Sequence, residues 1–187
     1  MSSDGGLPGA YWDHYARYMG EPVHLDRHDR GNLQILAYDN VIERAMVFAT
    51  IGLTLYAQRL GHTMEVAIAV DDALGTVPFL VADCLLWAVE VGHAPHHGNA
   101  IGDIAPYYPR FAERFGKAAL YFTGCQGLPD DFARVALPGG RKGEVLMAMF
   151  ISAAEYDFLQ ANGRSALEDR FVAAAIDPFT LDRPSVI

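Results

Sequence analysis

The sequence predicts an α+β fold of the α/β sandwich type, with helices packed on a mixed, largely antiparallel sheet of about five strands. Two observations lead to this prediction. Five short apolar segments, separated by turn residues, have the length and composition of strands, and three of them follow one another closely. Longer segments near the N-terminus, in the middle and near the C-terminus carry apolar residues at helical spacing instead.

The first element is a predicted helix over residues 8–19. Pro8 suits the first turn of a helix, and Gly20 ends the pattern. Aromatic residues recur along this segment every three or four positions, which is more typical of a face that docks on a core than of a ligand site. The stripe consists of Tyr11, Trp12, Tyr15, Tyr18 and Met19.

Three strand candidates follow, at residues 33–38, 45–53 and 64–70. Asp39-Asn40 is expected to turn the chain after the first strand, and Asp71-Asp72 after the third, because both residue types favour turns. Neighbouring strands joined by short loops pair with one another, so we expect an antiparallel meander.

A central helix is predicted from Leu74/Val77 to Val91, where nearly every residue is apolar. Asp83 and Glu90 lie seven residues apart and share its narrow polar side. Because so little of the helix is polar, we expect other elements to cover most of it.

The second half of the chain supplies the remaining strands. Residues 111–115 predict a helical turn, and residues 118–122 and 144–151 predict the fourth and fifth strands. The segment PGGRKG, at 138–143, precedes a strand, whereas phosphate-binding loops precede helices. It therefore predicts a turn and no phosphate site.

Two capping boxes mark the C-terminal helices. The segment SAAE at 152–155 opens a helix that Asn162-Gly163 is expected to end. The segment SALE at 165–168 repeats the pattern and opens a last helix, which stops before Pro178.

Composition narrows the function classes. The 187 residues, 51% of them hydrophobic, are expected to form one folded domain spanning 1–187. A net charge of −9 and the lack of a Lys/Arg stripe argue against nucleic acid as a partner. No apolar run reaches the length of a membrane span, and no secretory signal pattern or paired-cysteine spacing appears, so we expect a cytoplasmic protein with free thiols.

The ligand-like cluster of the sequence is His93, His96 and His97. Two histidines three or four residues apart on one helix face can share a zinc ion, but Pro95 and Gly98 interrupt this segment. Exposed loop histidines are therefore favoured, and a metal-dependent hydrolase that uses this loop stays an alternative. Motifs for nucleophilic catalysis are missing as well, so the sequence predicts no catalytic residue, metal or cofactor.

In their order along the chain, these elements resemble the suppressor-of-fused (SUFU-like) domain family. An aromatic helix ends in GEP at 20–22, and a strand ends in TIGLT at 50–54, similar to the family's Thr-Val-Gly-Met/Leu-Ser segment. The strand MEVAIAV, a long helix and a glycine-containing loop follow. An apolar strand then leads into SAAEYDFLQANGRSALEDRF. The resemblance covers about residues 10–175 and implies a single SUFU-like domain of the bacterial stand-alone type.

The resemblance implies a binding role. Animal relatives sequester zinc-finger transcription factors, and stand-alone bacterial relatives are described as immunity proteins that neutralise toxin domains. We therefore expect a non-enzymatic, immunity-type protein whose partner is a protein, toxin-like and basic enough to be attracted by an acidic surface. A structural component that forms homo-oligomers stays a further alternative, and the oligomeric state is left open.

The partner-contacting surface does not follow from the resemblance, because the loop HAPHHGNAIGDIAPYYPR differs in composition from that of the relatives. Two binding modes are expected from general principles. An edge strand can accept a strand of the partner. Alternatively, this loop provides the contacts, because aromatic side chains are enriched at interface hot spots. The candidate partner-binding residues are His93, His96, His97, Tyr107 and Tyr108.

Overall fold

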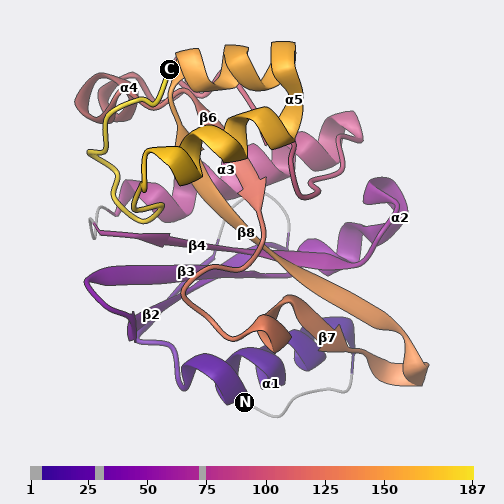
Figure 1. The fold of residues 1–187 in the computed structure, drawn as a ribbon. Helices are drawn as coiled ribbons and strands as arrows, with labels where there is room; N and C mark the ends of the chain where they lie inside the picture. Colours follow the sequence, from indigo (N-terminus) through magenta and orange to yellow (C-terminus); the bar gives the residue numbers. More distant parts are fainter. Residues whose placement is uncertain (1–5, 28–31, 72–74) are drawn as a thin grey trace.

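The computed structural model describes residues 6–27, 32–71 and 75–187. An eight-stranded sheet forms its middle layer, and helices cover both faces (Figure 1). The strands run in the order β1-β2-β3-β4-β8-β6-β5, and β7 pairs with β8 off this path. Their bounds are β1 His24–Arg27, β2 Gln34–Ile42, β3 Ala45–Ile51, β4 Met64–Val70, β5 Ala100–Ile101, β6 Ala119–Thr123, β7 Arg134–Ala136 and β8 Lys142–Ile151.

This sheet confirms the predicted fold class. Strands β4 and β8 pair in parallel and the other pairs are antiparallel, so the sheet is mixed and largely antiparallel. The expected number of about five strands is too low. The three additional strands β1, β5 and β7 have four, two and three residues, and such short segments carry too few positions for an alternating pattern.

The meander β2-β3-β4 is confirmed, but the predicted turn at Asp39-Asn40 is wrong. Strand β2 continues to Ile42, and the chain turns at Glu43 and Arg44 instead. The pairing register shifts between Tyr38 and Ile42, and Asn40 has a φ of 58°. Asparagine tolerates a positive φ, so a bulge forms at Asn40. Strand β2 therefore continues through Asp39-Asn40, although this dipeptide is typical of a turn. Asp72 and Leu74, which the sequence assigns to a turn and a helix start, lie outside the described residues.

Buried Glu65 explains the TIGLT segment at the end of β3. Its carboxylate accepts hydrogen bonds from the Thr50 hydroxyl at 2.6 Å and from the amides of Gly52, Leu53 and Thr54 at 2.9, 3.2 and 3.0 Å. Gly52 has a φ of 111°, which favours glycine. The motif thus wraps the chain around a carboxylate of the neighbouring strand.

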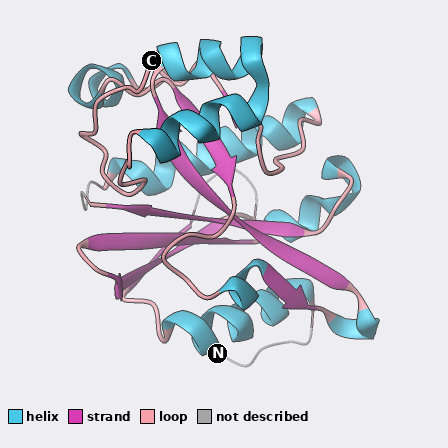
Figure 2. Ribbon diagram, viewed as in Figure 1, coloured by secondary structure: helices cyan, strands magenta, loops and turns pink. Residues whose placement is uncertain are grey.

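The helices form two outer layers (Figure 2). Their bounds are α1 Leu7–Met19, α2 Ala57–Leu60, α3 Thr76–Val91, α4 Pro109–Phe115 and α5 Ala153–Ala173. Alternate residues of β8 contact opposite layers. Leu146 and Phe150 share a core with α3 and α4. On the other face, Val145 packs with α1 and Ile151 packs with α5. Helices α1 and α5 therefore share one face of the sheet, and its twist carries them to opposite ends of the view in Figure 1. In the described part of the chain, no helix has the length and apolar character needed to cross a bilayer.

Helix α5 confirms the first capping box and corrects the second. Ser152 and Glu155 exchange hydrogen bonds as predicted. The helix path breaks at Gly163, where φ is 81°. Among the described residues, however, no capping bond joins Ser165 and Glu168, and the carboxylate of Glu168 accepts a hydrogen bond from the Tyr121 hydroxyl of β6 at 2.8 Å.

A buried ion pair fixes the segment after α5. The guanidinium of Arg183 donates to both carboxylate oxygens of Glu155, at 2.7 and 3.0 Å, and both side chains are almost fully buried. The ammonium of Lys117 donates to the Arg183 carbonyl at 2.9 Å. Hydrogen bonds to Glu155 hold its pKa below the ordinary value although burial alone would raise it.

Candidate functional site

A groove of about 410 Å³ lies between the outward face of α3 and the segment that follows β5. Exposed aromatic rings and carboxylates occur together along it. Its lining comprises Asp83, Cys84, Leu86, Trp87, Glu90, Ile101, Gly102, Asp103, Ile104, Tyr107 and Tyr108.

The helical repeat of α3 provides one wall of the groove. The inner side of the helix is buried in the core, as the sequence predicts. Its outward side carries Phe79, Asp83, Trp87 and Glu90 at intervals of three or four residues, which places them in one row. Trp87 and Phe79 are each 45% exposed, so two large aromatic side chains of this helix face the solvent.

The loop after β5 provides the opposite wall. Buried Ile104 anchors this segment, because its carbonyl accepts hydrogen bonds from the amides of Tyr107 and Tyr108 at 3.2 and 2.9 Å. The Tyr108 hydroxyl donates to the Asp83 carboxylate and so ties the loop to α3. Tyr107, in contrast, is 78% exposed. One tyrosine therefore fixes the wall and its neighbour projects from it.

The three histidines of the loop point to different places. The ring centroid of His93 lies 6.3 Å from that of Trp87, and its Nε2 lies 3.2 Å from the Asn99 side-chain amide. His96 is exposed, and its Nδ1 lies 3.2 Å from the His97 carbonyl. Among the described residues, no group of three or more His, Cys, Asp or Glu side chains could hold a metal ion.

His97 joins the loop to helix α5. Its Nε2 lies 2.7 Å from the Glu168 carboxylate, the same oxygen that Tyr121 contacts. Arg164 packs over Gly98, where an added Cβ would lie 2.2 Å from Cδ of the arginine. His97 is therefore part of a contact between two elements of the fold, whereas His93 lies beside Trp87, which lines the groove.

Neither thiol has the character of a nucleophile. Burial, together with the Asp83 charge, raises the pKa of Cys84 to about 12, and burial raises that of Cys125 to about 11. Thiols with such pKa values are almost fully protonated at neutral pH, whereas nucleophilic cysteines are thiolates. The cysteine at the groove therefore contributes packing.

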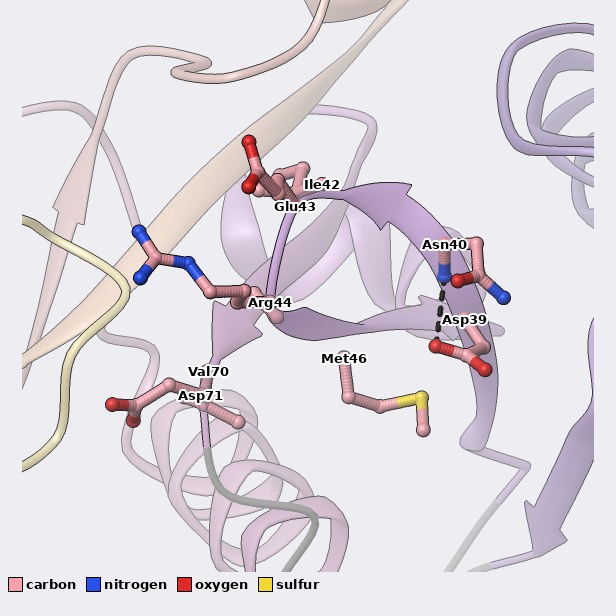
Figure 3. Close-up of a pocket in the computed structure, with 9 residues that line it drawn as sticks. Asp39, Asn40, Ile42, Glu43, Arg44, Met46, Val70 and Asp71 are labelled. Atoms are coloured by element: carbon pink, nitrogen blue, oxygen red, sulfur yellow. Dashed lines mark hydrogen bonds between the residues drawn. The ribbon is translucent and has the colours of Figure 1, made fainter.

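A second hollow, of about 500 Å³, lies at the turn between β2 and β3 (Figure 3). Asp39, Glu43, Arg44 and Asp71 surround it, and in Figure 3 the side chains of Glu43, Arg44 and Asp71 extend to one side of the view, away from that of Asp39. The hydrogen bond drawn there joins the Asn40 amide to the Asp39 side chain. Because its polar groups do not converge, this hollow is a weaker candidate than the groove on α3.

The fold matches known structures along nearly its whole length. A SUFU (suppressor of fused protein) homolog from Neisseria gonorrhoeae FA 1090 gives a TM-score of 0.72 at 15% identity and covers 97% of each chain. The chain has the suppressor-of-fused fold. The Sufu–Fu complex structure gives a TM-score of 0.67 at 10% identity, over 97% of this chain and 93% of that one.

Drosophila Suppressor of Fused shows the same fold within a longer chain, with a TM-score of 0.64 at 10% identity, over 97% of this chain and 50% of that one. Comparisons of the sequence with protein-family models and with curated proteins give no match.

In this suppressor-of-fused fold, sequence reasoning located the loop wall of the groove but missed Trp87. Phe79, Asp83 and Trp87 are four residues apart, and this spacing could have predicted that they share the outward side of α3.

Proposed function

We propose that residues 1–187 form a single non-enzymatic protein-binding domain, which acts in the cytoplasm as an immunity-type protein and sequesters or neutralises a toxin-like partner. The suppressor-of-fused fold supports a binding role, because the similar Sufu chain has been crystallised in a complex with Fu. Stable protein binding needs a rigid scaffold and a complementary surface, and no reactive group.

The observation that carries this proposal is the exposure of aromatic side chains on both walls of the α3 groove. Trp87 projects from one wall and Tyr107 from the other. Buried aromatic anchors dominate the energetics of many interfaces, and tryptophan and tyrosine are enriched among them. We therefore assign the partner contact to this groove.

The loop histidines and tyrosines have distinct roles in this proposal. Tyr107 and His93 contact the partner directly, and Tyr108 holds the wall through its hydrogen bond to Asp83. His96 is exposed on the same loop, and His97 keeps the loop in place through Glu168. The alternative of a metal-dependent hydrolase has no support in this geometry, because the three imidazoles diverge.

The test is a capture experiment with a matched control. The wild-type chain and the variants Trp87→Ala/Tyr107→Ala and Val172→Ala are immobilised and exposed to lysate of the native host, and the captured protein is then purified for affinity measurement. Val172 is 80% exposed on α5, away from the groove, so its variant is expected to keep the partner. The double variant is expected to weaken binding at least tenfold.

Three results would count against the proposal. Unchanged affinity of the double variant for a purified partner would remove the groove from the binding surface. Stoichiometric metal, with turnover that depends on His93 or His96, would favour the hydrolase. A stable homo-oligomer that binds no other protein would favour a structural role.

A further inference from the structure

We propose that the groove on α3 accepts the side chain of an arginine residue from the partner protein. This inference rests on the proposed function, since it assumes that a protein occupies the groove. It adds the chemistry of the group recognised there.

The aromatic walls suit a flat cation. Trp87 and Tyr107 expose their rings across a groove whose floor is formed by apolar residues such as Leu86 and Ile101. A guanidinium is planar and weakly hydrated, and it stacks on aromatic faces, with tryptophan giving the strongest attraction. A lysine ammonium is a compact, strongly hydrated charge and gains less from such walls.

The carboxylates supply the opposite charge. Exposed Glu90 follows Trp87 by three residues on the same side of α3, and exposed Asp103 lies on the loop wall. Asp83 lies between the two walls and accepts the Tyr108 hydrogen bond. A guanidinium has five N–H donors, so it can contact more than one carboxylate while it lies against a ring. With a net charge of −9, the chain attracts a basic partner at long range as well.

Other occupants fit less well. A metal ion needs ligands that converge on one point, and the described carboxylates do not. A second copy of this chain, with its groove facing this one across the two-fold axis, would bring the same carboxylates against each other. A purely apolar side chain would bury Glu90 or Asp103 without a partner, which costs free energy. A phosphate or an acidic peptide would be repelled by the three carboxylates of the groove.

The test uses three capped pentapeptides, Gly-Ser-Xaa-Ser-Gly, in which Xaa is arginine, lysine or citrulline. Citrulline keeps the shape of arginine but carries no charge. The sequence has two tryptophans, so a Trp12→Phe background lets fluorescence report Trp87 alone. The arginine peptide is expected to perturb this signal in a saturable and salt-sensitive way, with citrulline binding at least about tenfold weaker.

Two charge reversals provide a matched comparison. Glu90→Lys and Asp169→Lys change the net charge equally and both positions are exposed, but Asp169 lies on α5. Glu90→Lys is expected to weaken arginine-peptide binding about tenfold, whereas Asp169→Lys changes it less than about twofold, because exposed charges beyond a Debye length are screened. Circular dichroism of each variant verifies that it is folded.

Several results would overturn the inference. These are equal binding of the arginine and citrulline peptides, equal effects of the two charge reversals, or no change in Trp87 fluorescence up to the solubility limit of the arginine peptide. A concentration-dependent dimer that Trp87→Ala abolishes would make a second copy the occupant. In each case, a captured partner that still depends on Trp87 and Tyr107 would leave the proposed function standing, so the two failures can be told apart.

Discussion

Replacing Glu65 with glutamine tests how the fold holds a buried carboxylate at the end of β3. Glu65 is fully buried, and its two oxygens accept hydrogen bonds from the Thr50 hydroxyl and from three consecutive backbone amides. Glutamine has nearly the same shape, but its NH₂ group would face a backbone N–H or the hydroxyl. At least one amide would then lose its acceptor, which costs about 1–3 kcal/mol.

The pH dependence of this substitution has a defined sign. Burial outweighs the hydrogen bonds and raises the pKa of Glu65 from 4.5 to about 7. The folded protein therefore takes up the proton at higher pH than the unfolded chain does. The resulting stabilisation is fully present below pH 4.5 and is lost as the pH rises through 7. This difference in pKa between the folded and the unfolded protein corresponds to about 3 kcal/mol in the free energy of unfolding.

Urea unfolding of the wild type and Glu65→Gln at several pH values between 4 and 8 measures this effect. The wild type is expected to gain about 3 kcal/mol relative to the variant as the pH falls across this range. Comparing the two proteins cancels the titration of the other carboxylates, including Glu155, whose lowered pKa acts in the opposite direction. Glu113→Gln, at an exposed position, is the control and should show no such trend. A stability difference that stays constant from pH 4 to pH 8 would refute the reasoning.

Three further substitutions test other parts of the scaffold. Arg183→Met leaves Glu155 buried without its partner and is expected to destabilise the fold by about 3–5 kcal/mol in urea unfolding. A loss below about 1 kcal/mol would contradict a stabilising Arg183–Glu155 ion pair. Gly52→Ala, at a φ of 111° with its Cβ 2.2 Å from the Asn32 carbonyl oxygen, should lower the melting temperature more than the open Gly75→Ala does. Leu85→Asp puts an unpaired charge into the core below α3, and retention of a cooperative unfolding transition would argue against that burial.

The elements that the sequence predicted well are those whose pattern is local. Strand β4 matches its predicted bounds of 64–70, because every residue from Met64 to Val70 is buried between two layers and all of them except Glu65 are apolar. Helix α1 and the capping box at Ser152 are likewise encoded within a few neighbouring residues. Such signals do not depend on what the distant parts of the chain do.

The missed features depend on distant partners. The two residues of β5 form a strand because β6 offers them a pairing edge. Glu168 has the spacing of a capping residue, yet Tyr121 and His97, 47 and 71 residues away in the chain, use its carboxylate. A local pattern contains no information about such competitors, so the sequence predicted a second capping box that does not form.

Only the loop wall of the candidate groove was predicted, because the other wall depends on how α3 packs against distant parts of the chain. The segment around Tyr107 was recognised as a functional loop from its composition, but α3 was expected to be covered on most sides because it is so apolar. Ten residues of the helix are already buried, which is enough to hold it on the sheet. Trp87 and Tyr107 are thus not required for that packing, and removing their side chains should change binding far more than stability. Two exposed aromatic rings that the fold does not need are best explained by a surface that another protein covers.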